Sequence, residues 1–171
     1  ERKKIEEIAD MEGAWVYSFF AELNSDKGWY CPDYEKAIRK GFLGVLAEVE
    51  EELKATLVVD DASMNKTHLL KALAMELKAG IEYSKRYAVL ARELAKKEKG
   101  ERKAGLLKIA EICDWVPANP ARTFWEALQT MWFLHLLGEL EHGSNARSPG
   151  RVDQYLYPYY KQDIDEGRLT K

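Results

Sequence analysis

Apolar residues recur every three or four positions along residues 32–53, the spacing that gives an α-helix one apolar face. Asp33 stands at the start of this pattern, where its carboxylate can accept a hydrogen bond from the first helical turn. Glu35 suits the positive end of the helix dipole. The pattern therefore predicts an amphipathic helix. Its apolar stripe comprises Ile38, Phe42, Val45, Leu46, Val49 and Leu53.

A second and longer segment, residues 64–99, repeats the same spacing. Gly100 follows as the expected helix stop, because glycine readily takes the left-handed conformation that ends many helices. Gly80 interrupts the segment and costs a helix about 1 kcal/mol relative to alanine. We predict one long helix that is weakened at Gly80. Its apolar positions are Leu69, Leu70, Leu73, Leu77, Ile81, Tyr87, Leu90 and Leu94.

Two more helices are predicted in the following part of the chain. The first covers residues 101–116 and ends before Pro117, because proline lacks the amide hydrogen that a helix needs. For the second, Asn119 is the expected N-cap and Pro120 the first helical residue. This helix has little polar face, so we expect it to need enclosure on most sides and to be exposed if residues 1–171 stand alone. Its apolar residues are Phe124, Trp125, Leu128, Met131, Trp132, Phe133, Leu134, Leu136 and Leu137.

The N-terminal segment admits two interpretations. Trp15, Tyr17 and Phe19 alternate as in a strand, whereas Trp15, Phe19 and Leu23 share one face of a helix, and we favour the helix. No hairpin signal, internal repeat or break in composition divides the chain. Residues 1–171 are therefore predicted to form a single, mainly α unit. The chain ends suggest that this unit is an incomplete portion of a longer polypeptide.

Composition restricts the classes of function. The 171 residues include 26 basic and 29 acidic ones, and the net charge of −3 gives no electrostatic attraction for nucleic acid or for an anionic membrane. No apolar run approaches the roughly 20 residues of a membrane span, and the first residues lack the order of a signal peptide. Two distant cysteines, Cys31 and Cys113, fit buried free thiols in a reducing compartment. We expect a cytoplasmic protein.

Motifs for metals and nucleotides are weak. Glu139 and His142 have the E-x-x-H spacing of di-iron carboxylate bundles, but neither His68 nor His135 has a glutamate three residues earlier. The second copy that such a site needs is therefore missing, and a solvated helix end explains the pair better. We interpret His135 as a hydrogen-bonded core histidine. The common phosphate-binding, serine-hydrolase and zinc-protease motifs do not occur.

The segment HGSNARSPGR, residues 142–151, gathers small and polar residues directly after the aromatic helix. Backbone groups that are held inside a protein must find partners, and such a link can line a pocket with polar groups. An ordinary surface turn has the same composition. The residues alone leave both interpretations open.

Three segments are similar to the N-terminal part of the pyruvate formate-lyase-like glycyl radical enzymes, the branch with diol dehydratases, choline trimethylamine-lyase, hydroxyproline dehydratase and arylacetate decarboxylases. They are PDYEKAIRKGFLGVLAEVEEEL, EICDWVPANPARTFWEALQTMWFLHLL and SPGRVDQYLYPYYKQDIDEGRLT. Their most specific portions are Pro117–Gln129 and Gly150–Tyr160. The resemblance implies the helical N-terminal part of an α/β barrel, in which the tyrosine-rich stretch anchors a loop that lines the substrate cavity. Pro158 would start a helix at Tyr159, and Gly150 would allow a turn before it.

The chemistry that this resemblance implies is radical chemistry. A glycyl radical, installed by a separate S-adenosylmethionine-dependent iron–sulfur activase, takes hydrogen from a cysteine, and the thiyl radical attacks a small organic substrate to cleave a C–C, C–N or C–O bond. Both radical residues belong to the later half of such enzymes, so neither Cys31 nor Cys113 is predicted to be catalytic and no cofactor or metal is expected in this chain. The implied protein is an anaerobic homo-oligomeric lyase whose partners are its substrate and its activating enzyme. A stand-alone helical interaction domain without catalysis is the alternative.

Departures from the diol-dehydrating pattern bear on the substrate. Those enzymes carry Gly-His before the DYEK helix and ESNGHS before the GR-DQY segment, whereas the matching positions here hold Trp29, Asn145 and Ala146. We expect these three residues and Arg147 to lie near the substrate. The missing polar groups would leave polyol hydroxyls without partners, which disfavours glycerol dehydration and favours a bulkier or more apolar substrate.

Overall fold

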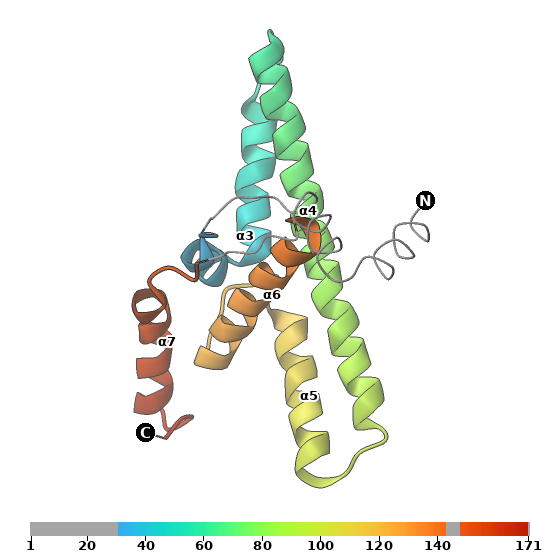
Figure 1. Ribbon diagram of the computed structural model, residues 1–171, viewed down its shortest axis with the longest axis vertical. Helices are drawn as coiled ribbons and strands as arrows, with labels where there is room; N and C mark the ends of the chain where they lie inside the picture. Colours follow the sequence, from blue (N-terminus) through green and yellow to red (C-terminus); the bar gives the residue numbers. More distant parts are fainter. Residues whose placement is uncertain (1–30, 143–147, 171) are drawn as a thin grey trace, which may run out of the picture.

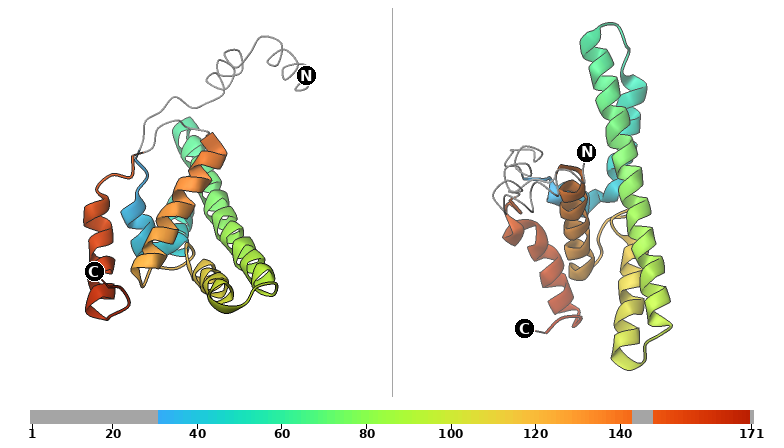
Figure 2. Two further views of the ribbon diagram at one scale, coloured as in Figure 1. Left: turned by 60° about the horizontal axis from the view of Figure 1, so that its bottom comes forward. Right: turned by 45° about the vertical axis from the view of Figure 1, so that its right-hand side comes forward.

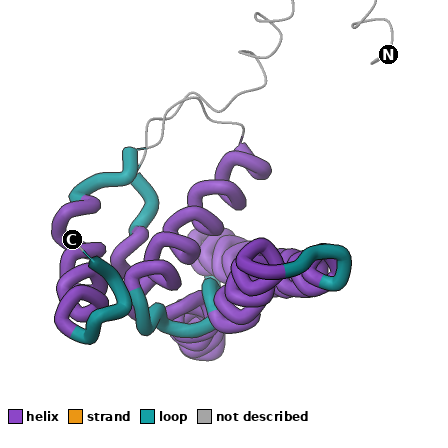
Figure 3. Tube along the Cα trace, turned by 90° about the horizontal axis from the view of Figure 1, so that it is seen from below, coloured by secondary structure: helices purple, strands orange, loops and turns teal. Residues whose placement is uncertain are grey.

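The computed structural model describes residues 31–142 and 148–170, and these residues form five α-helices and no strand (Figure 3). The mainly α class predicted from the sequence is confirmed. The N-terminal segment that admitted two interpretations falls outside the described residues. The helices are α3 (Tyr34–Ala55), α4 (Asp61–Ala95), α5 (Gly100–Trp115), α6 (Phe124–His142) and α7 (Val152–Asp165).

The long helix α4 organises the other helices (Figure 1). α3 packs along its N-terminal half and α5 along its C-terminal half, so that α4 takes part in two helical hairpins pointing in opposite directions. α6 lies across the middle and contacts α3, α4 and α5, while α7 packs against α6 (Figure 2). None of the helices in the described ranges combines the length and apolar character that a membrane crossing requires.

Side chains cap the first two helices. The Asp33 carboxylate accepts a hydrogen bond of 2.9 Å from the Lys36 amide, which confirms the predicted N-cap of α3. At the start of α4, Asp60 and Ser63 form a reciprocal capping box, in which each side chain accepts a hydrogen bond from the backbone amide of the other residue. This pairing places the start of α4 at Asp61, three residues before the apolar pattern begins.

The apolar stripe of α3 is not carried by one straight helix. α3 is kinked at Gly41, which has φ 66° and ψ 166°. A Cβ atom at Gly41 would lie 2.5 Å from the Ala118 carbonyl oxygen, so that only glycine fits. The Phe42 and Leu43 amides donate to the Pro117 and Ala118 carbonyls at 2.7 and 2.9 Å. The connection between α5 and α6 thus supplies hydrogen bonds that the kink removes from the helix.

Gly100 does not end the long helix. α4 ends at Ala95, where the Lys96 amide still donates to the Arg92 carbonyl, and Gly100 is the first residue of α5. Its φ of 59° places it in the left-handed region. The reversal between α4 and α5 requires this conformation, which glycine adopts without steric cost.

The prediction that Asn119 caps α6 is wrong. The Asn119 side chain donates instead to the Trp115 carbonyl at 2.9 Å, so it satisfies the end of α5. α6 begins at Phe124, and the Thr123 hydroxyl accepts a hydrogen bond of 3.2 Å from the Glu126 amide. Thr123 and Glu126 stand three residues apart, as in the T-x-x-E signature of a helix start. Asn119 and Thr123 are both residue types that favour an N-cap, and it is Thr123 that caps α6.

Pro158 lies inside α7, which begins at Val152, rather than at a helix start. Proline at this position removes the hydrogen bond that residue 158 would donate to the Gln154 carbonyl. Both Gln154 and Pro158 are exposed, so water can satisfy that carbonyl. The helix therefore tolerates proline on its solvent side.

α6 is buried on one side only within the described residues. Ala127, Thr130 and Phe133 are buried, whereas Trp125 and Trp132 are 46% and 57% exposed. This exposure is what the sequence predicted for residues 1–171 alone. An aromatic helix of this kind has apolar area that further contacts could cover.

The two cysteines differ in burial. Cys113 is buried as predicted, and burial raises the pKa of its thiol to about 11, with the nearby Asp114 adding to the effect. It therefore stays protonated and unreactive at neutral pH. Cys31 is exposed, so the prediction of burial is wrong for this residue. Cys31 lies just before α3 and outside the helical core.

Candidate functional site

The tyrosine-rich start of α7 meets the start of α3 and the middle of α6. Tyr34 is only 1% exposed, and its hydroxyl shares a hydrogen bond of 3.1 Å with His135 Nδ1. The Tyr34 ring stacks on Tyr155 with the ring centroids 6.1 Å apart, and His135 stacks on Trp132. We call Tyr34, His135 and Tyr155 the tyrosine junction. The hydrogen bond predicted for His135 is confirmed, but His135 is only half-buried, so the prediction of a core histidine is wrong.

Tyr155 ties the junction to the segment that precedes α7. Its hydroxyl donates a hydrogen bond of 2.6 Å to the Pro149 carbonyl. Burial raises the pKa of Tyr155 to about 12, and the neighbouring Tyr34 and Cys31 add to this shift. Because the hydroxyl stays protonated at neutral pH, it remains a hydrogen-bond donor. The tyrosine-rich stretch therefore anchors residues 148–150.

Cys31 and Gly150 meet beside the junction. Gly150 has φ 66°, and a Cβ atom added to it would lie 2.8 Å from Cys31 Sγ. The glycine thus provides the left-handed turn expected from the sequence and lets the two segments approach closely. The predicted substrate residues lie outside the described residues, in the two segments that enter the described structure at this contact. They are Trp29, Asn145, Ala146 and Arg147.

The E-x-x-H pair gains no further support. Glu139 lies on α6, but the side chain of His142 is outside the described part of the chain. Among the side chains that the structure describes, no group of three or more histidine, cysteine, aspartate or glutamate residues could hold a metal ion. The junction itself offers hydroxyl, imidazole and backbone groups, which suit positioning and hydrogen bonding.

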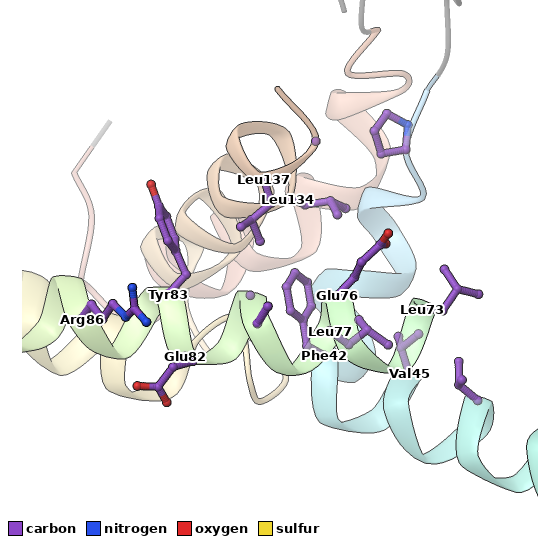
Figure 4. A pocket seen from close by; sticks show the side chains of 15 residues that line it. Phe42, Val45, Leu73, Glu76, Leu77, Glu82, Tyr83, Arg86, Leu134 and Leu137 are labelled. Carbon is purple, nitrogen blue, oxygen red and sulfur yellow. The ribbon is translucent and has the colours of Figure 1, made fainter. Parts of the chain in front are cut away.

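A second feature is an apolar groove between three helices, which we call the α3–α4–α6 groove (Figure 4). It has a volume of about 610 Å³ and is lined by Phe42 and Val45 of α3, by Leu77 of α4 and by Leu137 of α6, among others. Gly80 lies in this lining, where a Cβ atom would come within 2.8 Å of both Leu137 Cδ1 and Phe42 Cε2. Gly80 therefore weakens α4 locally but lets α3 and α6 close on it.

Sequence reasoning missed Tyr34 as part of the site. Its signal was present, because Tyr34 lies four residues before Ile38 and extends the apolar stripe of α3 by one turn. The contact between Cys31 and Gly150 had no such local signal. It joins segments at opposite ends of the chain, and only the packing of α3 against α6 and α7 creates it.

The sequence profile of the family described as pyruvate formate lyase-like matches residues 6–171. The chain belongs to the pyruvate formate lyase-like family. The resemblance carried by the DYEK, PANPARTFWEALQ and GRVDQYLYPYY segments is thereby confirmed.

Curated members of the family are similar over most of this chain. Isethionate sulfite-lyase of Desulfovibrio desulfuricans is 43% identical over 143 residues, which cover 81% of this chain and 17% of the relative. Trans-4-hydroxy-L-proline dehydratase of Clostridioides difficile is 36% identical over 161 residues, covering 92% of this chain and 20% of the relative. The chain thus spans about a fifth or less of the length of these relatives.

Solved structures give the same result. A glycyl radical enzyme from Archaeoglobus fulgidus superposes with a TM-score of 0.79 at 37% identity, over 90% of this chain and 21% of that one. The glycerol-bound form of the B12-independent glycerol dehydratase from Clostridium butyricum has a TM-score of 0.79 at 36% identity, over 85% and 18%. This pyruvate formate lyase-like chain corresponds to the helical N-terminal part of such enzymes.

Proposed function

We propose that the chain is the helical N-terminal part of a glycyl radical lyase that acts on a small organic substrate. The observation that carries this proposal is the 43% identity to an isethionate sulfite-lyase within a family match that spans residues 6–171. The radical residues would lie outside residues 1–171. This chain would contribute scaffold and part of the pocket wall.

In the proposed reaction, a glycyl radical installed by an S-adenosylmethionine-dependent iron–sulfur activase takes a hydrogen atom from a cysteine thiol. The thiyl radical takes a hydrogen atom from the substrate, and the substrate radical then breaks a C–C, C–N or C–O bond. The sulfite-lyase relatives add C–S cleavage to these possibilities. The product radical recovers a hydrogen atom from the cysteine, which regenerates the thiyl radical and closes the cycle.

Four residues are proposed to border the substrate, namely Trp29, Asn145, Ala146 and Arg147. The contact between Cys31 and Gly150 supports this grouping, because Trp29 is two residues from Cys31 and Arg147 is three residues from Gly150. The hydrogen bond from Tyr155 to the Pro149 carbonyl supports a fixed end for the segment that carries Arg147. A fixed end restricts the positions that neighbouring side chains can reach.

Arg147 is proposed to bind an anionic group of the substrate, which departs from the more apolar substrate that the sequence alone favoured. Its guanidinium can donate two parallel hydrogen bonds to a sulfonate or carboxylate, which a lysine cannot reproduce. The names of the relatives isethionate sulfite-lyase and (2S)-3-sulfopropanediol dehydratase support a sulfonate as the first probe.

The Arg147 proposal is tested in the full-length, activated enzyme with isethionate and 3-sulfopropanediol. Arg147→Ala should lower kcat/KM about 10- to 100-fold, because a hydrogen bond to a charged group contributes about 1.5–3 kcal/mol, and Arg147→Lys should recover part of this loss. Arg151→Ala is the matched control, since Arg151 forms an exposed ion pair with Asp153. Equal losses in the Arg147 and Arg151 variants would contradict the assignment.

The radical proposal is tested by electron paramagnetic resonance. The full-length gene is expressed anaerobically with its activase, and a glycyl doublet should appear after activation. Absence of the doublet with an activase that works on another substrate protein would reject the proposal. A stop codon directly after Lys171 would favour the stand-alone scaffold instead.

A further inference from the structure

The α3–α4–α6 groove presents an apolar surface that the described residues leave partly open. Phe42, Leu77 and Leu137 converge in it from three helices (Figure 4). Leu73 also lines the groove and is 37% exposed. A hollow of about 610 Å³ with this lining lies within the range of about 300–1,000 Å³ that is typical of binding pockets. Its shape and chemistry suit a set of apolar side chains.

The position of Pro32 favours one occupant. Pro32 itself lines the groove, so residues 1–30 join the described structure at the edge of the groove. The end of α7, by contrast, lies beside the start of α6. Asp163, near the end of α7, accepts a hydrogen bond of 2.9 Å from the amide of Phe124, the first residue of α6. Leu137, which lines the groove, is about 20 Å from Phe124 along α6 at a rise of 1.5 Å per residue. The end of α7 therefore lies far from the groove.

The sequence before Pro32 has a pattern that fits the groove. Trp15, Phe19 and Leu23 recur at intervals of four and so share one face of a helix, and Glu22 is the single charged residue in the segment WVYSFFAEL, residues 15–23. Two and a half turns of helix are about 13 Å long, which is shorter than the roughly 20 Å of α4 between Leu73 and Arg86.

The connection is also long enough. Pro32 lies nine positions after Leu23, and an extended chain covers up to about 30 Å in nine steps of about 3.3 Å. Leu23 can therefore reach any point of the groove from its attachment at Pro32. Because the segment is covalently attached, its effective concentration at the groove is high, which favours it over a separate molecule.

We propose that residues 15–23 form a short amphipathic helix that docks in the α3–α4–α6 groove, with the face of Trp15, Phe19 and Leu23 turned toward Leu73, Leu77 and Leu137. Docking would hold residues 24–30 at both ends, between the groove and the contact of Cys31 with Gly150. Trp29 lies in this held segment. The docking does not depend on the radical chemistry, so failure of either proposal leaves the other to be judged separately.

Cross-linking in the full-length polypeptide tests the proposed contact. Cys31 is replaced by serine, and Phe19→Cys is combined with Leu73→Cys, which places one thiol in the segment and one in the groove. A short bis-maleimide should then join the two sites, and mass spectrometry of the digested protein identifies the linked peptides. The control combines Phe19→Cys with Met75→Cys, because Met75 lies on the same helix, is 66% exposed and does not belong to the groove lining.

The proposal is supported if the Phe19–Leu73 peptide forms within one molecule and the Phe19–Met75 peptide does not. Absence of both linked peptides would overturn it. A Phe19–Leu73 link found only in covalent dimers would also overturn it, because the occupant would then be a second copy of the chain.

Hydrogen exchange provides a test that needs no cysteines. Phe19→Glu should make the amides of residues 73–83 exchange about tenfold faster in the full-length polypeptide, because the docked segment would no longer cover them. Tyr17→Glu is the matched control, since Tyr17 lies on the opposite helical face from Phe19. Unchanged exchange in the Phe19 variant would show that another part of the polypeptide covers the groove and would overturn the proposal.

Discussion

The tyrosine junction and the α3–α4–α6 groove are both formed where α3 packs near α6, yet their contacts are of different kinds. In the junction, Tyr34 is buried with its hydroxyl bonded to His135, and Tyr155 bonds to the Pro149 carbonyl. In the groove, Phe42 is buried against Leu137, but Leu73 at the same groove is 37% exposed. Tyrosine can satisfy its polar end and bury its ring among neighbours, whereas aliphatic surface is stabilised only when it is covered. The junction is thus stabilised by hydrogen bonds and ring contacts, whereas part of the apolar groove lining is exposed within the described residues.

The largest expected effect comes from removing the centre of the junction. Tyr34→Ala should lower the free energy of local opening around α6 by about 3–5 kcal/mol, because truncation of a fully buried aromatic residue leaves a cavity. Tyr34→Phe keeps the ring and loses the bond to His135, so it should cost about 1 kcal/mol. Native-state hydrogen exchange of α6 measures both losses. If Tyr34→Ala lowered the free energy of local opening by less than Tyr34→Phe does, the junction would not be tightly packed.

An intermediate effect is expected at the groove, where two helical glycines give a matched pair. Gly80→Ala should destabilise the protein by about 1–2 kcal/mol, because the new methyl group would meet Leu137 and Phe42 at 2.8 Å and this crowding exceeds the gain in helix propensity. Gly105→Ala on α5 has open space around it and should stabilise by about 0.5–1 kcal/mol. Thermal denaturation of the two variants measures the difference. Stabilisation by both would mean that α3 and α6 do not close on α4 at Gly80.

A smaller effect is expected at the edge of the junction. Tyr155→Phe removes the hydrogen bond to the Pro149 carbonyl and should cost about 0.5–1.5 kcal/mol, seen as faster hydrogen exchange at residues 150–152. Tyr157→Phe is the control, because Tyr157 is 58% exposed and should have no measurable effect. Equal exchange in the two variants would contradict the anchoring role of Tyr155.

The smallest effect is a dependence on alkaline pH. The pKa of Tyr155 is raised from its ordinary value of 10 to about 12, chiefly by burial, so folding favours its protonated form. This contribution is fully present below pH 10 and is lost as the pH rises from about 10 to about 12. The wild-type protein should therefore lose stability more steeply in this window than Tyr155→Phe. Parallel pH profiles of the melting temperature would contradict the assignment.

Much of the helical framework was predictable because its causes are local. The apolar period and Asp33 located α3, and the amide of Lys36 three residues later confirms the cap. Local signals failed where two of them competed, as with Asn119 and Thr123 at the start of α6. They also failed at Pro158, since the tolerance of proline inside α7 depends on the exposure of that side of the helix.

The candidate site was predictable to a lesser degree. Sequence similarity singled out the tyrosine-rich segment and Gly150, and in the structure both belong to one contact region. The role of Tyr34 in that region was not predictable from the sequence, because it depends on the packing of α3 against α6. Trp29, Asn145, Ala146 and Arg147 remain predictions, because they lie outside the described residues.

By itself, the sequence determined the helical class, the capped start of α3 and the membership of the family, because periodicity, side-chain capping and residue identity act over short stretches of chain. Only the tertiary structure decided the kink at Gly41, the meeting of Cys31 with Gly150 and the groove beside Gly80. Each of these three features depends on contacts between residues that are distant in sequence. The space between packed helices is set by several helices together, so no single helix sequence predicts it.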